Sequence, residues 1–143
     1  MLNKILSRKF IGGNIANKHR MQFMGKYTLV IGASENPERY SNKAISRLKH
    51  YGHSIAAIGN KDGNVEGVSF SREKKPFDGI DTVTLYVGVP HQAEYIDYVL
   101  SLKPKRIIFN PGTENDEFEA RAREQGIQTM EACTLVLLGT GQY

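Results

Sequence analysis

A glycine, two serines and a proline lie close together in the stretch "VIGASENPERYS", residues 30–41, and these residue types suit phosphate binding. Gly32 has no Cβ, so its backbone can approach a phosphate closely. Ser34 offers a hydroxyl, and Ser41 could cap a helix whose free N–H groups and positive dipole end attract a pyrophosphate. The alternative is that a Gly-x-Ser turn after a strand only redirects the chain. A second loop of similar type, "NPGTEN" at residues 110–115, favours the binding interpretation.

The absence of two features of NAD sites limits which phosphate-containing ligand these loops could bind. The dinucleotide fingerprint G-x-G-x-x-G is absent, because Pro37 stands at its third glycine position. An NAD site also needs an acid at the end of the second strand, whereas here that strand ends in Asn60 and Lys61. A lysine suits a phosphorylated ribose, as in NADP or coenzyme A (CoA), although it is equally typical of a solvated loop.

The elements that must position these loops alternate along the chain. Five short apolar runs, with the third and fourth at 81–90 and 105–112, predict strands, and helical spacing of apolar residues follows most of them. A threonine cap begins the helix predicted within 113–126. This pattern predicts an α/β fold, a doubly wound parallel sheet of about five strands in a three-layer αβα arrangement. The simplest strand order, 3-2-1-4-5, places a ligand crevice between strands 1 and 4, at their carboxyl ends.

Length and charge limit the classes of protein that fit. A chain of 143 residues predicts one domain, at 27–143, and its single cysteine excludes an intramolecular disulfide. The net charge of +4 comes from residues 1–26, because the remainder carries 13 basic and 15 acidic residues. We therefore expect no nucleic-acid partner, no membrane span and a cytoplasmic location. Residues 1–26 are predicted to be a basic extension, either flexible or non-native, a docked arm, or a targeting segment.

Four separate motifs then resemble a known family. The run "VIGASENPERYSNKAISRLKHYGH", the "VGVP" after the third strand, "IIFNPGTENDEFEARAREQGI" and the late Cys133 are similar to those of the small stand-alone CoA-binding domain proteins, often called YccU-like. These are related to the CoA-binding domain of the succinyl-CoA synthetase alpha subunit and share its Rossmann-like fold. The resemblance covers residues 27–143. The chain departs from the family in "IGN" at the end of the second strand and in the tail "ACTLVLLGTGQY".

The resemblance implies a binding site for CoA or an acyl-CoA. It places the CoA phosphates at the first loop, at Gly32, Ala33, Ser34, Asn36, Pro37, Arg39, Tyr40 and Ser41. It places the adenosine near Asn60 and Lys61 and beside Val87 and Pro90, and the pantetheine arm near Asn110, Pro111 and Gly112.

No catalytic constellation is visible in the sequence. The histidines are scattered at 19, 50, 53 and 91, without a nearby carboxylate or hydroxyl at the spacing of a dyad. Cys133 lies among apolar residues, which is more typical of an inert core thiol than of a nucleophile. The acids of "ENDEFEAR" fit the first turn of a helix and are expected to face water. We therefore expect non-catalytic binding of CoA, with a protein partner or homo-oligomer open; the alternatives are a small NADP-dependent reductase and an assembly module with a degenerate nucleotide site.

Overall fold

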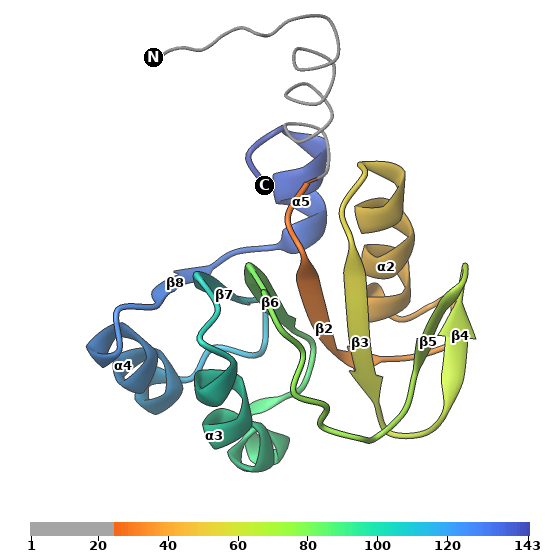
Figure 1. The fold of residues 1–143 in the computed structure, drawn as a ribbon. Helices are drawn as coiled ribbons and strands as arrows, with labels where there is room; N and C mark the ends of the chain where they lie inside the picture. The colour runs from red at the N-terminus through yellow and green to blue at the C-terminus, as the bar shows by residue number, and fades with distance from the viewer. Residues whose placement is uncertain (1–24) are drawn as a thin grey trace, which may run out of the picture.

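The computed structural model describes residues 25–143, and the predictions for the segment before them lie outside that range. A parallel five-stranded sheet forms the centre of the domain (Figure 1). Its strands are β2 (Thr28–Ala33), β3 (Ile55–Gly59), β6 (Thr82–Leu85), β7 (Arg106–Phe109) and β8 (Gln128–Glu131). The prediction of a doubly wound parallel sheet is confirmed.

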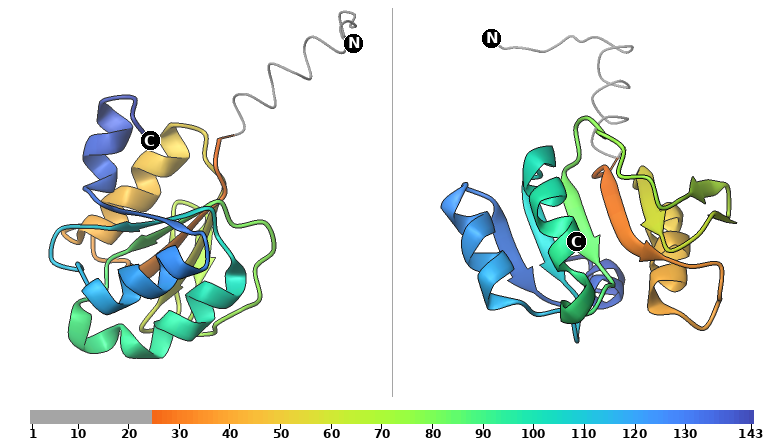
Figure 2. Two further views of the ribbon diagram at one scale, coloured as in Figure 1. Left: turned by 90° about the vertical axis from the view of Figure 1, so that its left-hand side faces the viewer. Right: turned by 90° about the horizontal axis from the view of Figure 1, so that it is seen from below.

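Helices cover both faces of this sheet (Figure 2). One face carries α3 (Ala93–Leu102), which follows the short 3-10 helix η1 (Val89–His91), and α4 (Asp116–Glu124). The other face carries α2 (Tyr40–His50) and α5 (Thr134–Gly139). The three-layer arrangement is therefore confirmed, and the apolar tail after the cysteine is part of it as α5. Within the described residues, no helix has the length and apolar character needed to cross a membrane.

The alternation of side chains along β2 explains how the two cores form. Leu29 and Ile31 pack in the core beneath α3 and α4, while Val30 packs in the core beneath α2 and α5. All three are fully buried, as expected for a central parallel strand that is covered on both faces. In the α4 core, the rings of Phe109 and Phe118 meet edge to face with their centroids 5.3 Å apart.

The predicted strand order is wrong. The order is β3-β2-β6-β7-β8, or 2-1-3-4-5 in chain order, so the third strand pairs with the first and not with the second. The outer edge of β3 is already occupied, because Gly59 N–H donates to Ser71 O at 3.0 Å just after the hairpin of β4 (Gly63–Val65) and β5 (Val68–Phe70). The chain then continues to the free edge of β2. The hairpin itself is a separate two-stranded antiparallel sheet.

The predicted helix caps are also wrong. Arg39, not Ser41, is the residue at the N-cap position of α2, and its side chain makes no capping hydrogen bond. Asn115, not Thr113, caps α4, because Asn115 Oδ1 accepts from Phe118 N–H at 3.2 Å. The hydroxyl of Thr113 instead donates to Asn110 O at 2.8 Å.

Candidate functional site

The carboxyl ends of β2 and β6 lie side by side and lead to opposite faces of the sheet. Tyr86 N–H donates to Ile31 O at 2.8 Å, so the two strand ends are tied together. Beyond this point β2 leads to α2, while β6 leads to η1 and α3. The topological switch point of this sheet, where open α/β folds bind ligands, therefore lies between the loops after β2 and β6. The predicted crevice is displaced by one strand, because the loop after β7 is not the direct neighbour of the β2 loop.

Gly32 is required by this close approach. Its φ is +100°, and a Cβ built there would lie 3.0 Å from both the carbonyl carbon and the oxygen of Tyr86. Val87 Cγ2 would lie 3.1 Å from the same position. The glycine therefore serves the contact between strands, so its presence is explained without a ligand.

The loop after β2 is organised by its own side chains. Ser34 Oγ accepts from Asn36 N–H at 3.1 Å, and Asn36 Oδ1 accepts from Glu38 N–H at 2.9 Å. Pro37, Glu38 and the N-cap residue of α2 are exposed beside this turn. Because the Ser34 hydroxyl accepts here, its proton can still be donated to a phosphate oxygen.

The first turn of α2 presents backbone N–H groups and positive charge to this loop. Tyr40 is 67% exposed, whereas Ser41 is buried, so the Ser41 side chain is not at the surface of the loop. Lys43 Nζ donates to Pro37 O at 2.8 Å, which places an ammonium group beside the turn. The sequence analysis missed Lys43; its position in the first turn after the loop was the available signal. A helix N-terminus with a lysine beside it attracts anions.

The end of β3 borders the crevice on the other side of β2. Asn60 and Lys61 are exposed there, directly after the strand. The following hairpin is tied to the first loop, since Asn64 N–H donates to Glu35 Oε2 at 2.9 Å. This hydrogen bond keeps the loop after β2 close to the hairpin that follows β3.

The loop after β6 forms the opposite border. Val87 is partly buried, and Pro90 is exposed in η1. Gln92, which is completely buried, donates from Nε2 to Val87 O at 2.9 Å and to Thr113 O at 2.7 Å. Its Oε1 accepts from Asn115 Nδ2 at 2.9 Å. Gln92 therefore joins the loops after β6 and β7, a role that the sequence analysis did not identify because a single glutamine gives no pattern.

The side chain of Asn110 is buried and hydrogen-bonded within the protein. It is 3% exposed, and its Nδ2 donates to Thr84 Oγ1 at 2.7 Å and to Leu85 O at 2.8 Å. Its Oδ1 accepts from Thr134 N–H at 2.9 Å, so the side chain connects β6, β7 and α5. The Asn110 side chain therefore makes structural contacts, and the prediction that its loop lies near the pantetheine arm stays a prediction. Pro111 and Gly112, the next two residues, are exposed.

The phenol of Tyr86 is not a general base in this setting. Burial raises the pKa of Tyr86 to about 12, with the Thr134 and Thr84 hydroxyls opposing the shift. The group is therefore neutral near pH 7. Cys133, half-buried, lies at the start of α5.

A separate hollow of about 740 Å³ lies away from this edge. Its lining includes Lys74, Phe77, Ile80, Tyr98 and Leu102. Ile80 precedes β6 and Leu102 ends α3, so the hollow is near the amino ends of the strands. It shares no residue with the loops described above.

Comparison with protein families decides the identity of the domain. The model of the CoA-binding domain family matches residues 26–139, which is most of the chain. The chain belongs to the CoA-binding domain family. A search among curated proteins finds no match.

Solved structures share the fold of this chain. One crystal structure is of a protein described as uncharacterized, whose sequence is 45% identical to this chain. The two structures match with a TM-score of 0.81 over 83% of this chain and 98% of the other. A Thermus thermophilus protein shares the fold at 18% identity, with a TM-score of 0.71 over 93% of this chain and 100% of that one.

An acetyl-coenzyme A synthetase of Candidatus Korarchaeum cryptofilum, solved with phosphate and ADP, also contains this fold. It is 19% identical to the CoA-binding domain, with a TM-score of 0.63 over 79% of this chain. The match spans 27% of the synthetase, so the domain corresponds to about a quarter of that protein.

Proposed function

We propose that this protein binds CoA or an acyl-CoA at the carboxyl edge of the sheet, between the loops after β2 and β6, without catalysing a reaction itself. The observation that carries the proposal is the switch point itself, combined with membership of the CoA-binding domain family. At that point the turn of Ser34 and Asn36, the N-terminus of α2 and Lys43 lie together.

Each part of the ligand has suitable groups within this edge. The pyrophosphate lies against the turn at Ser34, where the helix N-terminus and Lys43 favour negative charge. Lys61 at the end of β3 pairs with the 3′-phosphate, and the exposed Pro90 lies beside the adenine. The pantetheine arm runs toward Pro111 and Gly112.

Calorimetric titration with CoA, 3′-dephospho-CoA and NADPH at one fixed salt concentration tests the proposal. We expect saturable binding of CoA in preference to NADPH. The Lys61→Ala variant should weaken CoA about tenfold, because a hydrogen bond to a charged group contributes about 1.5 kcal/mol or more. It should weaken 3′-dephospho-CoA much less. Lys105→Ala is the matched control, because Lys105 is an exposed lysine just before β7, at the amino end of the sheet.

The other outcomes contradict the proposal in distinct ways. Preference for NADPH favours a small reductase, and binding of none of the three favours an assembly module. Equal losses for CoA and 3′-dephospho-CoA remove Lys61 from the 3′-phosphate. The location is tested by amide chemical shifts on adding CoA: changes confined to the hollow around Phe77 and Tyr98 would place the ligand elsewhere.

A further inference from the structure

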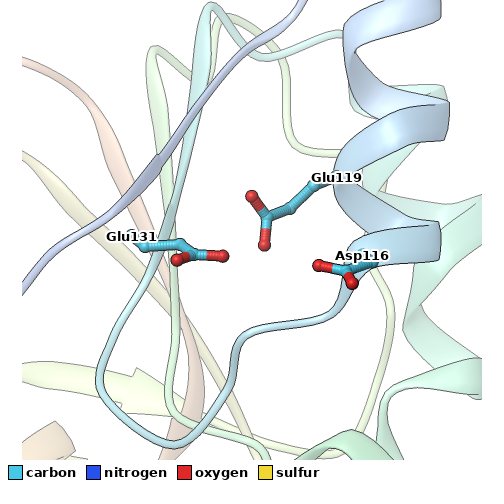
Figure 3. Close-up of side chains that lie close together, drawn as sticks. All are labelled: Asp116, Glu119 and Glu131. Atoms are coloured by element: carbon cyan, nitrogen blue, oxygen red, sulfur yellow. The ribbon is translucent and has the colours of Figure 1, made fainter.

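Three carboxylates gather beside β8, outside the proposed CoA crevice. Asp116 and Glu119 lie three residues apart on α4, so they share one face of the helix, and Glu131 is the last residue of β8 (Figure 3). One carboxylate oxygen from each residue lies within 4.8 Å of the other two. Asp116 and Glu131 are exposed, whereas Glu119 is buried between them.

The burial of Glu119 contradicts the expectation that the acids of this helix face water. The residue is 7% exposed, and among the described residues its Oε2 has no hydrogen-bond partner. Its Oε1 lies 3.7 Å from Arg123 Nη1, and that nitrogen also donates to Thr129 Oγ1 at 3.1 Å. A buried carboxylate with an unpartnered oxygen is unfavourable unless another positive group neutralises it.

The neighbouring charges make this arrangement less favourable still. Asp116 and Glu131 each bring a carboxylate oxygen within 4.8 Å of the Glu119 carboxylate. Arg123 pairs with Glu119 alone, and among the described residues neither Asp116 nor Glu131 forms an ion pair, so the three carboxylates together outnumber the positive charge beside them. The cluster therefore attracts a cation to the space between its oxygens.

We propose that Asp116, Glu119 and Glu131 bind a hard divalent cation such as Ca²⁺, Mg²⁺ or Mn²⁺. Carboxylate oxygens are the ligands that these ions prefer, and the three converging groups include no cysteine or histidine that would select a softer metal. Two oxygens on opposite sides of a Ca²⁺ ion, each about 2.4 Å away, are about 4.8 Å apart. The three carboxylate oxygens lie within this limit of one another and so are close enough to share a single ion. The exposed side of the cluster leaves room for water ligands to complete its coordination.

Metal titration of the full chain, after treatment with a chelator and at constant ionic strength, tests this proposal. We expect saturable binding in calorimetry with a dissociation constant of about 10⁻⁴ to 10⁻³ M, as for open sites with few protein ligands. The melting temperature should rise with metal concentration, because the ion binds the folded chain. Comparing CaCl₂, MgCl₂ and MnCl₂ identifies the preferred ion.

Two substitutions on one helix separate the site from general surface charge. Glu119→Gln keeps the size of the side chain and removes its charge, and should weaken binding about tenfold or more. Glu117→Gln removes an exposed charge from the same helix outside the cluster and should leave the affinity unchanged. Bound Mn²⁺ should broaden the amide resonances of residues 116–119 and 128–131 in particular.

Several results would overturn the proposal. One is the absence of saturable binding of all three ions at concentrations about tenfold above the expected range. Others are equal affinity in the Glu119→Gln variant, or broadening by Mn²⁺ centred elsewhere. Stabilisation by acid alone, without any response to metal, would mean that a proton shared with Glu131 neutralises Glu119. If Glu119→Gln fails to fold by circular dichroism, Glu131→Gln at an exposed position provides the same comparison.

Discussion

Replacing Gly32 with alanine tests whether the contact between β2 and β6 requires a residue without a side chain. Two effects should lower the stability of this variant: a strained backbone conformation and a steric clash. An L-residue in a left-handed conformation costs about 1–2 kcal/mol, and Gly32 has a φ of +100°. Placing a methyl group 3.0 Å from the Tyr86 backbone overpacks the strand ends, which costs about 1–3 kcal/mol. We therefore expect the free energy of unfolding to fall by about 2–5 kcal/mol, a large part of the total stability of a small domain.

Gly112→Ala is the matched control for this experiment. Gly112 has a similar φ of +92°, but a Cβ built there meets nothing within 4 Å. This variant should lose only the conformational term of about 1–2 kcal/mol. Because alanine reduces the entropy of the unfolded chain equally at both positions, that effect cancels in the difference. The difference of about 1–3 kcal/mol then reports the contact with Tyr86 alone.

Urea denaturation followed by circular dichroism measures both variants, with an unchanged m-value as the check that only stability has changed. Losses that agree within about 0.5 kcal/mol would refute the reasoning, because the Tyr86 backbone would then accommodate a Cβ without strain. A variant at Gly32 that is as stable as the parent protein would refute both terms together.

Two further predictions concern the amino end of β2 and the buried amide between the strands. His53 Nδ1 accepts from Lys26 N–H at 2.9 Å, and burial followed by the charge of Lys26 lowers the pKa of His53 from 6.5. Because the pKa of His53 is lower in the folded state than in the unfolded state, the contribution of neutral His53 to stability is present above about pH 6.5 and is lost as the pH falls. The fall in the free energy of unfolding between about pH 7 and pH 5 should therefore be smaller in the His53→Gln variant. An identical dependence of stability on pH in the two proteins would contradict this. Asn110→Ala should lower the free energy of unfolding by about 2–4 kcal/mol, because it leaves buried groups such as Thr134 N–H without partners. Asn64→Ala, at an exposed hairpin position, should cost less than about 1 kcal/mol, and urea denaturation would contradict the argument if the two losses were equal.

The elements of the fold could be predicted from the sequence because each is encoded locally. Apolar runs such as "TLVIG" form strands, and the spacing of Ala44, Ile45 and Leu48 forms a helix face that the structure buries. The strand order could not be predicted in the same way. Orders 3-2-1-4-5 and 2-1-3-4-5 contain identical elements in identical sequence. The observed order goes with a hydrogen bond from Gly59, at the end of β3, to Ser71, which lies outside the five main strands and occupies the outer edge of β3.

The position of the candidate site at one edge of the sheet could be predicted, because it follows from the order of strands and loops along the chain. The loops at Ser34, Lys61 and Pro90 follow strands, so the parallel sheet brings them to one edge whatever the strand order. The burial of Asn110 was not predictable, because it depends on Thr84 and on α5, a helix formed by what looked like an apolar tail. The assignment of CoA as the ligand rests on the family and not on residue spacing.

The hydrogen bonds at this edge imply that the proposed CoA site is largely formed before the ligand arrives. Gln92 fixes the loops after β6 and β7, and the carboxylate of Glu35 holds the first loop to the hairpin. The conformational entropy of ordering these loops is therefore lost during folding and not during binding. Affinity for CoA then depends on contacts such as those of Lys43 and Lys61. Substituting these lysines should consequently change CoA affinity with little change in the stability of the domain, whereas substituting Gln92 should change both.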